Sequence, residues 1–206
     1  MAPRGFGGRI VTASIVREIA ERAQQFKILH LAMAFGLPCY FMPDLPILRA
    51  MLEFNGQSAA DDLPMELPSD LPDDDERLVY SAREVMTKAS TLRGDIVGKD
   101  LMSVAMILGA TRIGDMIQSG GHSKADVPLL QFARHYRNAC AHGDRWEFRG
   151  TEPKTEATCR HLTLTSALHG QRATYTAVSP RLHVEFLDDI ANYFLPGSVA
   201  PPVRQP

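Results

Sequence analysis

The sequence predicts a mainly α-helical fold: a helical bundle with a small β-hairpin or meander before the C-terminal helix. Apolar residues recur at three- and four-residue steps over several long stretches, which is the spacing of amphipathic helices. Residues 144–178 are instead rich in threonine, aromatic and branched residues in partial alternation, which is typical of short strands. A chain of 206 residues with 45% hydrophobic and 22% charged content is long enough to bury one core. We therefore expect a single domain over residues 1–195.

The first half of the chain predicts two helices followed by a loop. Helical spacing runs through residues 14–35 and ends at a Gly-Leu-Pro sequence, and a short helix is expected within residues 43–54. Residues 55–75 combine clustered acidic residues with prolines and show no sustained period, so they predict a flexible acidic loop.

Two further helices are expected after this loop. Helical spacing returns at Asp75 and continues to Leu92, with Gly94 in the position of a C-terminal cap. Residues 95–121 are apolar on nearly all sides and predict a central helix, in which Gly109 and Gly114 either weaken the helix or allow close packing.

The next helix is predicted over residues 126–142, with Asp126 as N-cap and Pro128 in the first turn. Its core-facing stripe consists of Leu129, Phe132, Ala133, Tyr136 and Cys140. The β appendage over residues 144–178 follows. Ser179 and Pro180 then have the chemistry to begin a last helix, and residues 196–206 are expected to be a disordered tail.

Composition argues against several classes of protein. The longest apolar stretch is interrupted and shorter than the roughly 20 residues that a membrane helix needs, and the N-terminus lacks a signal-peptide pattern, so we expect a cytoplasmic protein. Cys39, Cys140 and Cys159 are far apart and form no CxxC pair, which predicts reduced, mostly buried thiols. We predict no metal site, no cofactor and no membrane partner.

The formal net charge of −2 conceals an uneven distribution. Residues 50–76 contain nine acidic residues and no Lys or Arg, so the rest of the chain has 22 basic residues against 24 − 9 = 15 acidic ones. A basic surface is therefore compatible with the acidic total. The acidic segment is either a solvated loop or a flexible guard over a basic site.

The helix over residues 126–142 has an unusual polar face. Opposite its apolar stripe, Gln131, His135, Asn138 and His142 follow at four- and three-residue spacing, and Arg134 and Arg137 border them. Arginine offers a planar fork for phosphate and histidine transfers protons near neutral pH, which together are what cleavage of RNA by its own 2′-hydroxyl requires.

A structural role explains the same residues differently. His142 lies in the last turn, where the helix dipole favours a positive side chain, and the arginines can pair with acidic neighbours. Arg137 and His142 are also about 140° apart around the helix, so one helix alone does not bring them face to face. Two copies packed across a symmetric dimer axis would bring them together.

The segment "RNACAH", residues 137–142, resembles the signature of the HEPN superfamily, in which an Arg is followed by a polar residue and, four to six positions after the Arg, by a His. Arg137, Asn138 and His142 match it, late in a helical chain as in HEPN bundles.

The resemblance implies a metal-independent endoribonuclease that is active as a homodimer, often as a toxin or in defence against phage. Arg137 would bind the scissile phosphate, His142 would transfer protons, and Asn138 would orient both. Arg134 and His135 are expected to line the cleft from helical geometry alone, and Arg145 belongs to a modestly basic segment expected to extend the RNA surface.

Two alternatives stay open. HEPN domains without nuclease activity also occur, and such a chain would be a helical dimer with a binding or regulatory role. A toxin held by an antitoxin, such as a nucleotidyltransferase, is the other. Trp146 either stacks on a base or belongs to the core.

Overall fold

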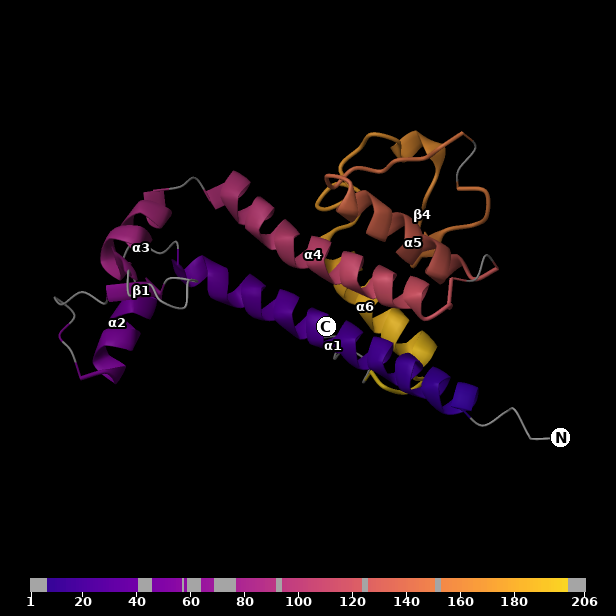
Figure 1. Cartoon of the computed structure of the whole chain (residues 1–206). Coiled ribbons are helices and arrows are strands. Elements are labelled where there is room, and N and C mark those ends of the chain that lie inside the picture. The colour runs from indigo at the N-terminus through magenta and orange to yellow at the C-terminus, as the bar shows by residue number, and fades with distance from the viewer. Residues whose placement is uncertain are drawn as a thin grey trace, which may run out of the picture. The chain divides into compact units, whose positions relative to one another are not determined.

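Helices account for most of the chain in the computed structural model, which describes residues 7–40, 46–56, 58, 64–68, 77–91, 94–123, 126–150 and 153–199 (Figure 1). The helices are α1 (Gly7–Tyr40), α2 (Pro46–Phe54), α3 (Ala82–Thr91), α4 (Gly94–Ser119), α5 (Pro128–Ala141) and α6 (Pro180–Phe194). The short strands are β1 (Pro64–Pro68), β2 (Arg77–Ser81), β3 (Thr158–Cys159) and β4 (Leu162–Thr163), and a 3₁₀ turn, η1, covers Ser166–Leu168. The prediction of a mainly helical chain with a small β element is confirmed.

The chain divides into two compact units, whereas the sequence predicts a single domain over residues 1–195. The bundle unit comprises Met1–Leu31 and Met102–Pro206, and the hairpin unit comprises Ala32–Leu101. Helices α1 and α4 each contribute residues to both units. Within the described part of the chain, no helix is both long and apolar enough to cross a membrane.

The core of the bundle unit is built from α1, α4, α5, α6 and the segment after α5. At its centre four aromatic rings meet with centroid separations of 5.6 to 6.3 Å: those of Phe132, Tyr136, Trp146 and Phe186. Trp146 is fully buried and stacks on Phe148 with an interplanar angle of 8°. Trp146 is therefore a core residue, and its ring has no free face for a base.

Helix α6 begins as the sequence predicted. Pro180 occupies its first turn, and the side-chain oxygen of Ser179 accepts a hydrogen bond from the Leu182 backbone N–H at 3.1 Å. Beyond the helix, the Ser198 N–H donates to the Leu195 carbonyl at 3.1 Å, whereas residues 200–206 of the expected tail lie outside the described residues.

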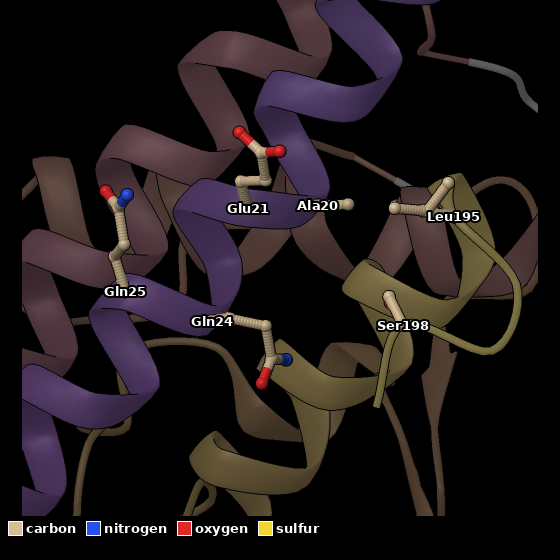
Figure 2. A pocket seen from close by; sticks show the side chains of 6 residues that line it. All are labelled: Ala20, Glu21, Gln24, Gln25, Leu195 and Ser198. Carbon is tan, nitrogen blue, oxygen red and sulfur yellow. The ribbon is translucent and has the colours of Figure 1, made fainter. Parts of the chain in front are cut away.

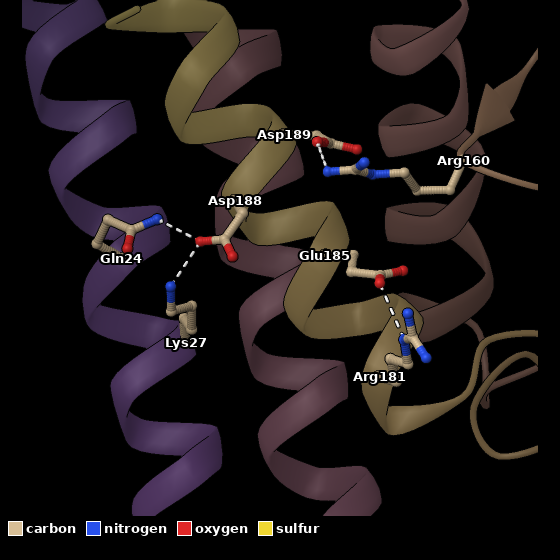
Figure 3. Close-up of polar contacts among 7 residues, drawn as sticks. All are labelled: Gln24, Lys27, Arg160, Arg181, Glu185, Asp188 and Asp189. Atoms are coloured by element: carbon tan, nitrogen blue, oxygen red, sulfur yellow. Dashed lines mark hydrogen bonds and ion pairs between the residues drawn. The ribbon is translucent and has the colours of Figure 1, made fainter. Parts of the chain in front are cut away.

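Polar contacts tie α6 to α1 and to the β3–β4 turn (Figure 3). Asp188 accepts from Lys27 at 2.7 Å and from Gln24 at 3.0 Å, and both members of the Lys27–Asp188 ion pair are largely buried. Asp189 pairs with Arg160 on the β3–β4 turn. These contacts fix the two helices around the apolar core.

Helix α5 differs slightly from the prediction at its start. Its N-cap is Val127, which makes no side-chain capping bond, so the expectation that Asp126 caps the helix is wrong. Pro128 stands at the first helical position, where a missing N–H costs nothing. The helix ends at Ala141 with His142 as C-cap.

The hairpin unit corrects three expectations. Strand β1 lies inside the segment predicted as a flexible loop and pairs antiparallel with β2, in register from Pro64↔Ser81 to Pro68↔Arg77. Residues 77–81, expected to be helical, form β2, and α3 begins only at Ala82. Gly94 starts α4 rather than capping the helix before it. Most of the remaining acidic segment, including residues 69–76, lies outside the described residues.

The β appendage is smaller than expected. Strands β3 and β4 have two residues each, and apart from η1 the other described residues of 144–178 form irregular chain with two isolated bridges, Arg145↔Arg172 and Thr174↔Val178. Its backbone is nevertheless tied down: the Trp146 N–H donates to the Gln171 carbonyl at 3.0 Å and the Gly170 N–H to the Trp146 carbonyl at 2.8 Å. The appendage packs Ala157, Cys159, Leu164 and Ala173 into the core.

Candidate functional site

The three residues of the Arg-Asn-His motif lie on the C-terminal turns of α5, on the part of the helix that the core does not cover. Arg137 and Asn138 are half-buried, and His142 is exposed. The adjacent Tyr136, Ala139 and Cys140 are buried on the opposite side. The motif side chains thus lie off the buried stripe of the helix, and His142 is the most exposed of the three.

Arg137 lies directly against α4, because α4 has a glycine where the two helices meet. A Cβ atom at Gly114 would be 2.4 Å from the Cβ and 2.5 Å from the Cγ of Arg137, which is too close for any side chain. Of the two roles that the sequence left open for Gly114, close packing is the one that the structure bears out. The aliphatic stem of Arg137 is thus held by the α4 backbone.

The guanidinium of Arg137 is held by two neighbours. Its Nε donates to Oδ1 of Asp115 at 2.8 Å and its Nη2 contacts the same oxygen at 2.7 Å, while Nη1 donates to Oδ1 of Asn138 at 3.2 Å. The Arg137 side chain remains 29% exposed. Asn138 therefore orients Arg137, and Asp115 partly neutralises it.

His142 is the residue on which the helix ends. Its backbone N–H donates to the carbonyls of Asn138 at 3.1 Å and Ala139 at 3.3 Å, so its backbone is fixed although it is no longer helical, with φ −114° and ψ 44°. The exposed imidazole makes no hydrogen bond or ion pair with any residue that the structure describes. Its nitrogens are open to solvent and to a partner.

A buried polar network holds the chain just after His142. The carboxylate of Asp144 accepts from the backbone N–H of Thr174 at 2.9 Å, from the Thr174 hydroxyl, and from Nε of Arg172 at 2.8 Å. On α4, Oγ of Ser103 accepts from Nη2 of Arg172 at 2.9 Å and lies 3.1 Å from the Thr174 hydroxyl. Sequence reasoning missed this network and Asp115, because their partners are 22 to 71 residues apart along the chain.

Two residues of the predicted polar face are not on the surface. His135 is only 4% exposed and packs edge-on against Phe148 with ring centroids 5.5 Å apart, and Gln131 is also buried. His135 is thus buried within the protomer, contrary to the expectation that it lines the cleft. Arg134 is exposed and donates to Nε2 of His135 at 3.1 Å. Helical geometry alone predicted that this face of α5 is exposed, but Phe148 of the irregular segment after α5 covers it at His135.

Arg145 remains at the surface, close in sequence to the motif. Its Nη1 donates to the Gly170 carbonyl at 2.7 Å, and its backbone N–H donates to the Ala139 carbonyl of α5 at 3.2 Å. Arg145 is thus placed beside the end of α5 with one guanidinium nitrogen anchored on the appendage. Contact with RNA by Arg134 or Arg145 stays a prediction.

The described cysteines do not take part in the site. Cys140 and Cys159 are buried, as predicted, whereas the Cys39 side chain lies outside the described part of the structure. Burial raises the pKa of the Cys159 thiol to about 12 and raises that of Cys140 as well, with a smaller contribution from Asp144 in the latter case. Both thiols stay protonated at neutral pH and are poor nucleophiles.

Two hollows of the bundle unit lie away from the motif. One, of about 450 Å³, lies between α1 and the end of α6 (Figure 2), and is lined by Ala20, Glu21, Gln24, Gln25, Leu195 and Ser198. The other, of about 340 Å³, lies between α1 and α4, and is lined by Glu18, Arg22, Phe26, Arg112 and Met116. Neither includes a motif residue, so the motif does not belong to these hollows.

Comparison with protein-family models, curated proteins and solved structures finds no significant match to this chain. The resemblance to HEPN proteins therefore rests on Arg137, Asn138 and His142 and on their position in a helical chain.

Proposed function

We propose that this protein is a metal-independent endoribonuclease of the HEPN type, which cleaves RNA in a composite cleft between two copies of the chain. The observation that carries the proposal is the joint presentation of Arg137 and His142 at one end of α5. Arg137 is oriented by Asn138 and still 29% exposed, and the imidazole of His142 is exposed on a fixed backbone.

The proposed chemistry needs only arginine and histidine side chains. The 2′-oxygen of a ribose attacks the adjacent phosphorus, the bond from phosphorus to the 5′-oxygen breaks, and the products are a 2′,3′-cyclic phosphate and a 5′-hydroxyl. An imidazole accepts the proton of the 2′-hydroxyl or donates one to the leaving 5′-oxygen. Arg137 stabilises the negative charge that develops on the phosphate oxygens.

A second copy of the chain completes the site. A single protomer offers one motif histidine, whereas the reaction uses both a general base and a general acid. An isologous dimer with the two α5 ends together would supply two histidines and two arginines in one cleft. An RNA strand suits an open surface of this kind better than it suits an enclosed pocket.

The first experiment incubates single-stranded RNA and transfer RNA with the wild-type protein and with His142→Ala and Arg137→Ala in EDTA. We expect the wild type alone to cleave, with 2′,3′-cyclic phosphate ends. His161→Ala, which removes an exposed histidine from the β3–β4 turn, and Arg181→Ala, which removes an exposed arginine from α6, serve as matched controls and should retain activity.

The second candidate function is a non-catalytic helical dimer with a binding or regulatory role. The Arg137–Asp115 ion pair favours it, because two of the guanidinium nitrogens are already engaged within the protomer. In that case neither the wild type nor any variant cleaves RNA. Cleavage by the wild type therefore separates the two functions, and circular dichroism with urea unfolding shows that each protein compared is folded.

The proposed biological role is that of a toxin or a phage-defence nuclease, with an antitoxin such as a nucleotidyltransferase as a candidate partner. Expression of the wild type should then arrest bacterial growth, whereas expression of His142→Ala at the same level should not. Equal growth with both proteins would contradict this biological role, whereas the cleavage assay would still decide whether the protein is a ribonuclease.

A further inference from the structure

The chain makes an unusual turn immediately after His142. Gly143 has φ +84° and Asp144 has φ +60°, so two successive residues adopt the left-handed conformation. Glycine accepts this conformation freely, but a residue with a Cβ does so at a cost in free energy. Aspartate is among the few other residues that adopt it, and here its side chain is almost fully buried.

The buried carboxylate of Asp144 accounts for the turn. It accepts three hydrogen bonds, two from Thr174 and one from Arg172, and the Asp144 carbonyl accepts a fourth from the Ala173 N–H at 2.8 Å. A buried carboxylate with this many donors holds its position tightly, because moving it leaves the charge unpaired. Asp144 is thereby attached to the segment at residues 172–174.

The same network reaches α4 through Ser103, which accepts from Arg172. The turn is therefore clamped to a helix that also packs against Arg137 through Gly114. The ends of helices normally fray, and a histidine at a C-cap would share that motion. Here Asp144, two positions after His142, is hydrogen-bonded to Arg172 and Thr174 of the appendage, and through Arg172 it is linked to Ser103 on α4.

We propose that Asp144 is a positioning residue for His142: by clamping the left-handed turn it holds the imidazole at the end of α5 in the geometry that proton transfer requires. The inference rests on the proposed ribonuclease function, and it assigns Asp144 a role through His142 rather than in contact with RNA. Arg172 and Ser103 act through the same hydrogen-bond network, because Arg172 donates to both Asp144 and Ser103.

Two substitutions separate the effect of the Asp144 carboxylate contacts from the effect of the left-handed turn itself. Asp144→Asn keeps a side chain that tolerates positive φ and loses the ion pair with Arg172, and Asp144→Gly removes every carboxylate contact while it allows the turn freely. Asp189→Asn is the control, because it removes a comparable ion pair, with Arg160, from α6. Circular dichroism and thermal unfolding first establish that each variant is folded at the temperature of measurement.

The decisive measurement is nuclear magnetic relaxation of the backbone amides of His142 and Gly143. In the wild type and Asp189→Asn we expect order parameters of about 0.85, and in both Asp144 variants values below about 0.6. Unchanged order at His142 in both Asp144 variants would overturn the proposal. This readout does not depend on catalysis, so it decides the role of Asp144 even if the wild type cleaves no RNA.

Kinetics provide the second readout when the wild type is active. We expect kcat to fall about 100-fold in Asp144→Asn, because small errors of placement cost rates of this order, with KM changed by less than about threefold. Asp189→Asn should keep the wild-type kcat. A rise in KM with an unchanged kcat would overturn the positioning role and assign Asp144 to RNA binding.

Discussion

Single residues around Arg137 have opposite effects on the proposed site. Asn138 and Gly114 place the guanidinium, whereas Asp115 puts a negative charge where a phosphate would bind. A phosphate oxygen must compete with Oδ1 of Asp115 for Nε and Nη2, or approach the outer edge of the guanidinium. We therefore expect the proposed affinity for RNA to depend on a residue outside the motif.

Asp115→Asn tests this competition. The amide keeps an oxygen that accepts from Arg137 but removes the charge, so we expect RNA to bind about fivefold more tightly at low salt, which corresponds to about 1 kcal/mol for a partly exposed pair. Binding is measured by fluorescence anisotropy in the His142→Ala background, which prevents cleavage. Glu185→Gln, which removes the partner of Arg181, is the control and should leave affinity unchanged. Equal affinity before and after the Asp115→Asn substitution would contradict the competition.

Gly114 has a different role, since it determines how closely α5 approaches α4. Gly114→Ala places a Cβ within 2.5 Å of the Arg137 stem, and we expect it to destabilise the fold by about 1–3 kcal/mol. Gly36→Ala is the matched control, because nothing lies within 4 Å of a Cβ there, and the better helix propensity of alanine should stabilise α1 by up to about 1 kcal/mol. Urea unfolding measures both changes. If Gly114→Ala also stabilised the protein, α4 and α5 would not approach each other closely at Gly114 and Arg137.

At the scale of helices, α1, α5 and α6 meet at a buried polar cluster that the proposed reaction does not use. The rings of His30 and His183 are 5.3 Å apart, and the hydroxyl of Tyr136 lies 3.2 Å from Nδ1 of His183. Nδ1 of His30 and Nε2 of His183 have no hydrogen-bond partner among the described residues. A Cβ at Gly109 of α4 would lie 3.2 Å from that Nε2, so α4 closes the cluster.

This cluster makes stability depend on pH. Burial, and to a smaller extent His30, lowers the pKa of His183 to about 3, and burial also lowers that of His30. In the unfolded chain histidine titrates near 6.5, so below that pH the unfolded state binds protons that the folded state excludes. The stabilising contribution is complete above about pH 6.5 and is lost as pH falls towards 3.

We expect His183 alone to lower the free energy of unfolding by about 2 kcal/mol between pH 7 and pH 5. His183→Gln removes one titrating group from the core and should flatten this pH dependence, at some cost in stability at pH 7. His161→Gln, on the surface, is the control. Urea unfolding at the two pH values provides the measurement, and an unchanged slope in His183→Gln would show that other groups determine the acid sensitivity.

The elements that the sequence predicted well are those with local signals. Helix α6 carries its own start, Ser179 followed by Pro180, and an apolar face at helical spacing, and all of these function as expected. Helix α5 carries Pro128 and a periodic stripe, so its position was predicted to within a few residues. The motif itself is also local, since Arg137 and His142 lie within one and a half turns.

The elements that were not predicted depend on partners far along the chain. Strand β1 is five residues with two prolines, and only its pairing with β2 distinguishes it from a loop. In β2, Leu78 continues the helical spacing of α3, so local periodicity favoured the wrong structure there. The same limitation hid the roles of Asp115 and Asp144, because no sequence pattern indicates that Asp115 meets Arg137 or that Asp144 meets Arg172.

At the scale of the molecule, the proposed dimer needs a surface beside the motif. Gly114 contacts Arg137, and Ser103 accepts from Arg172 of the network that holds Asp144, so α4 runs antiparallel to α5 between these two contacts. Two apolar residues on that stretch are exposed: Val104 by 56% and Leu108 by 40%. Exposed apolar side chains on the helix that packs against Arg137 are what an interface between two copies would cover.

Leu108→Glu tests this surface. A buried charge without a partner opposes association, so we expect the variant to be monomeric at concentrations at which the wild type is a dimer, with unchanged helicity. Leu195→Glu, at the end of α6 and also 40% exposed, is the matched control and should remain dimeric. Sedimentation equilibrium measures the association.

Cleavage measured over a range of protein concentrations connects this surface to catalysis. If two protomers share one cleft, the rate per protomer rises with concentration until the dimer is saturated, and Leu108→Glu requires far higher concentrations to reach the same rate. A monomeric variant with full activity would refute the composite cleft and require a single α5 to provide both the acid and the base. Loss of activity together with association would instead support a site that needs both copies of the chain.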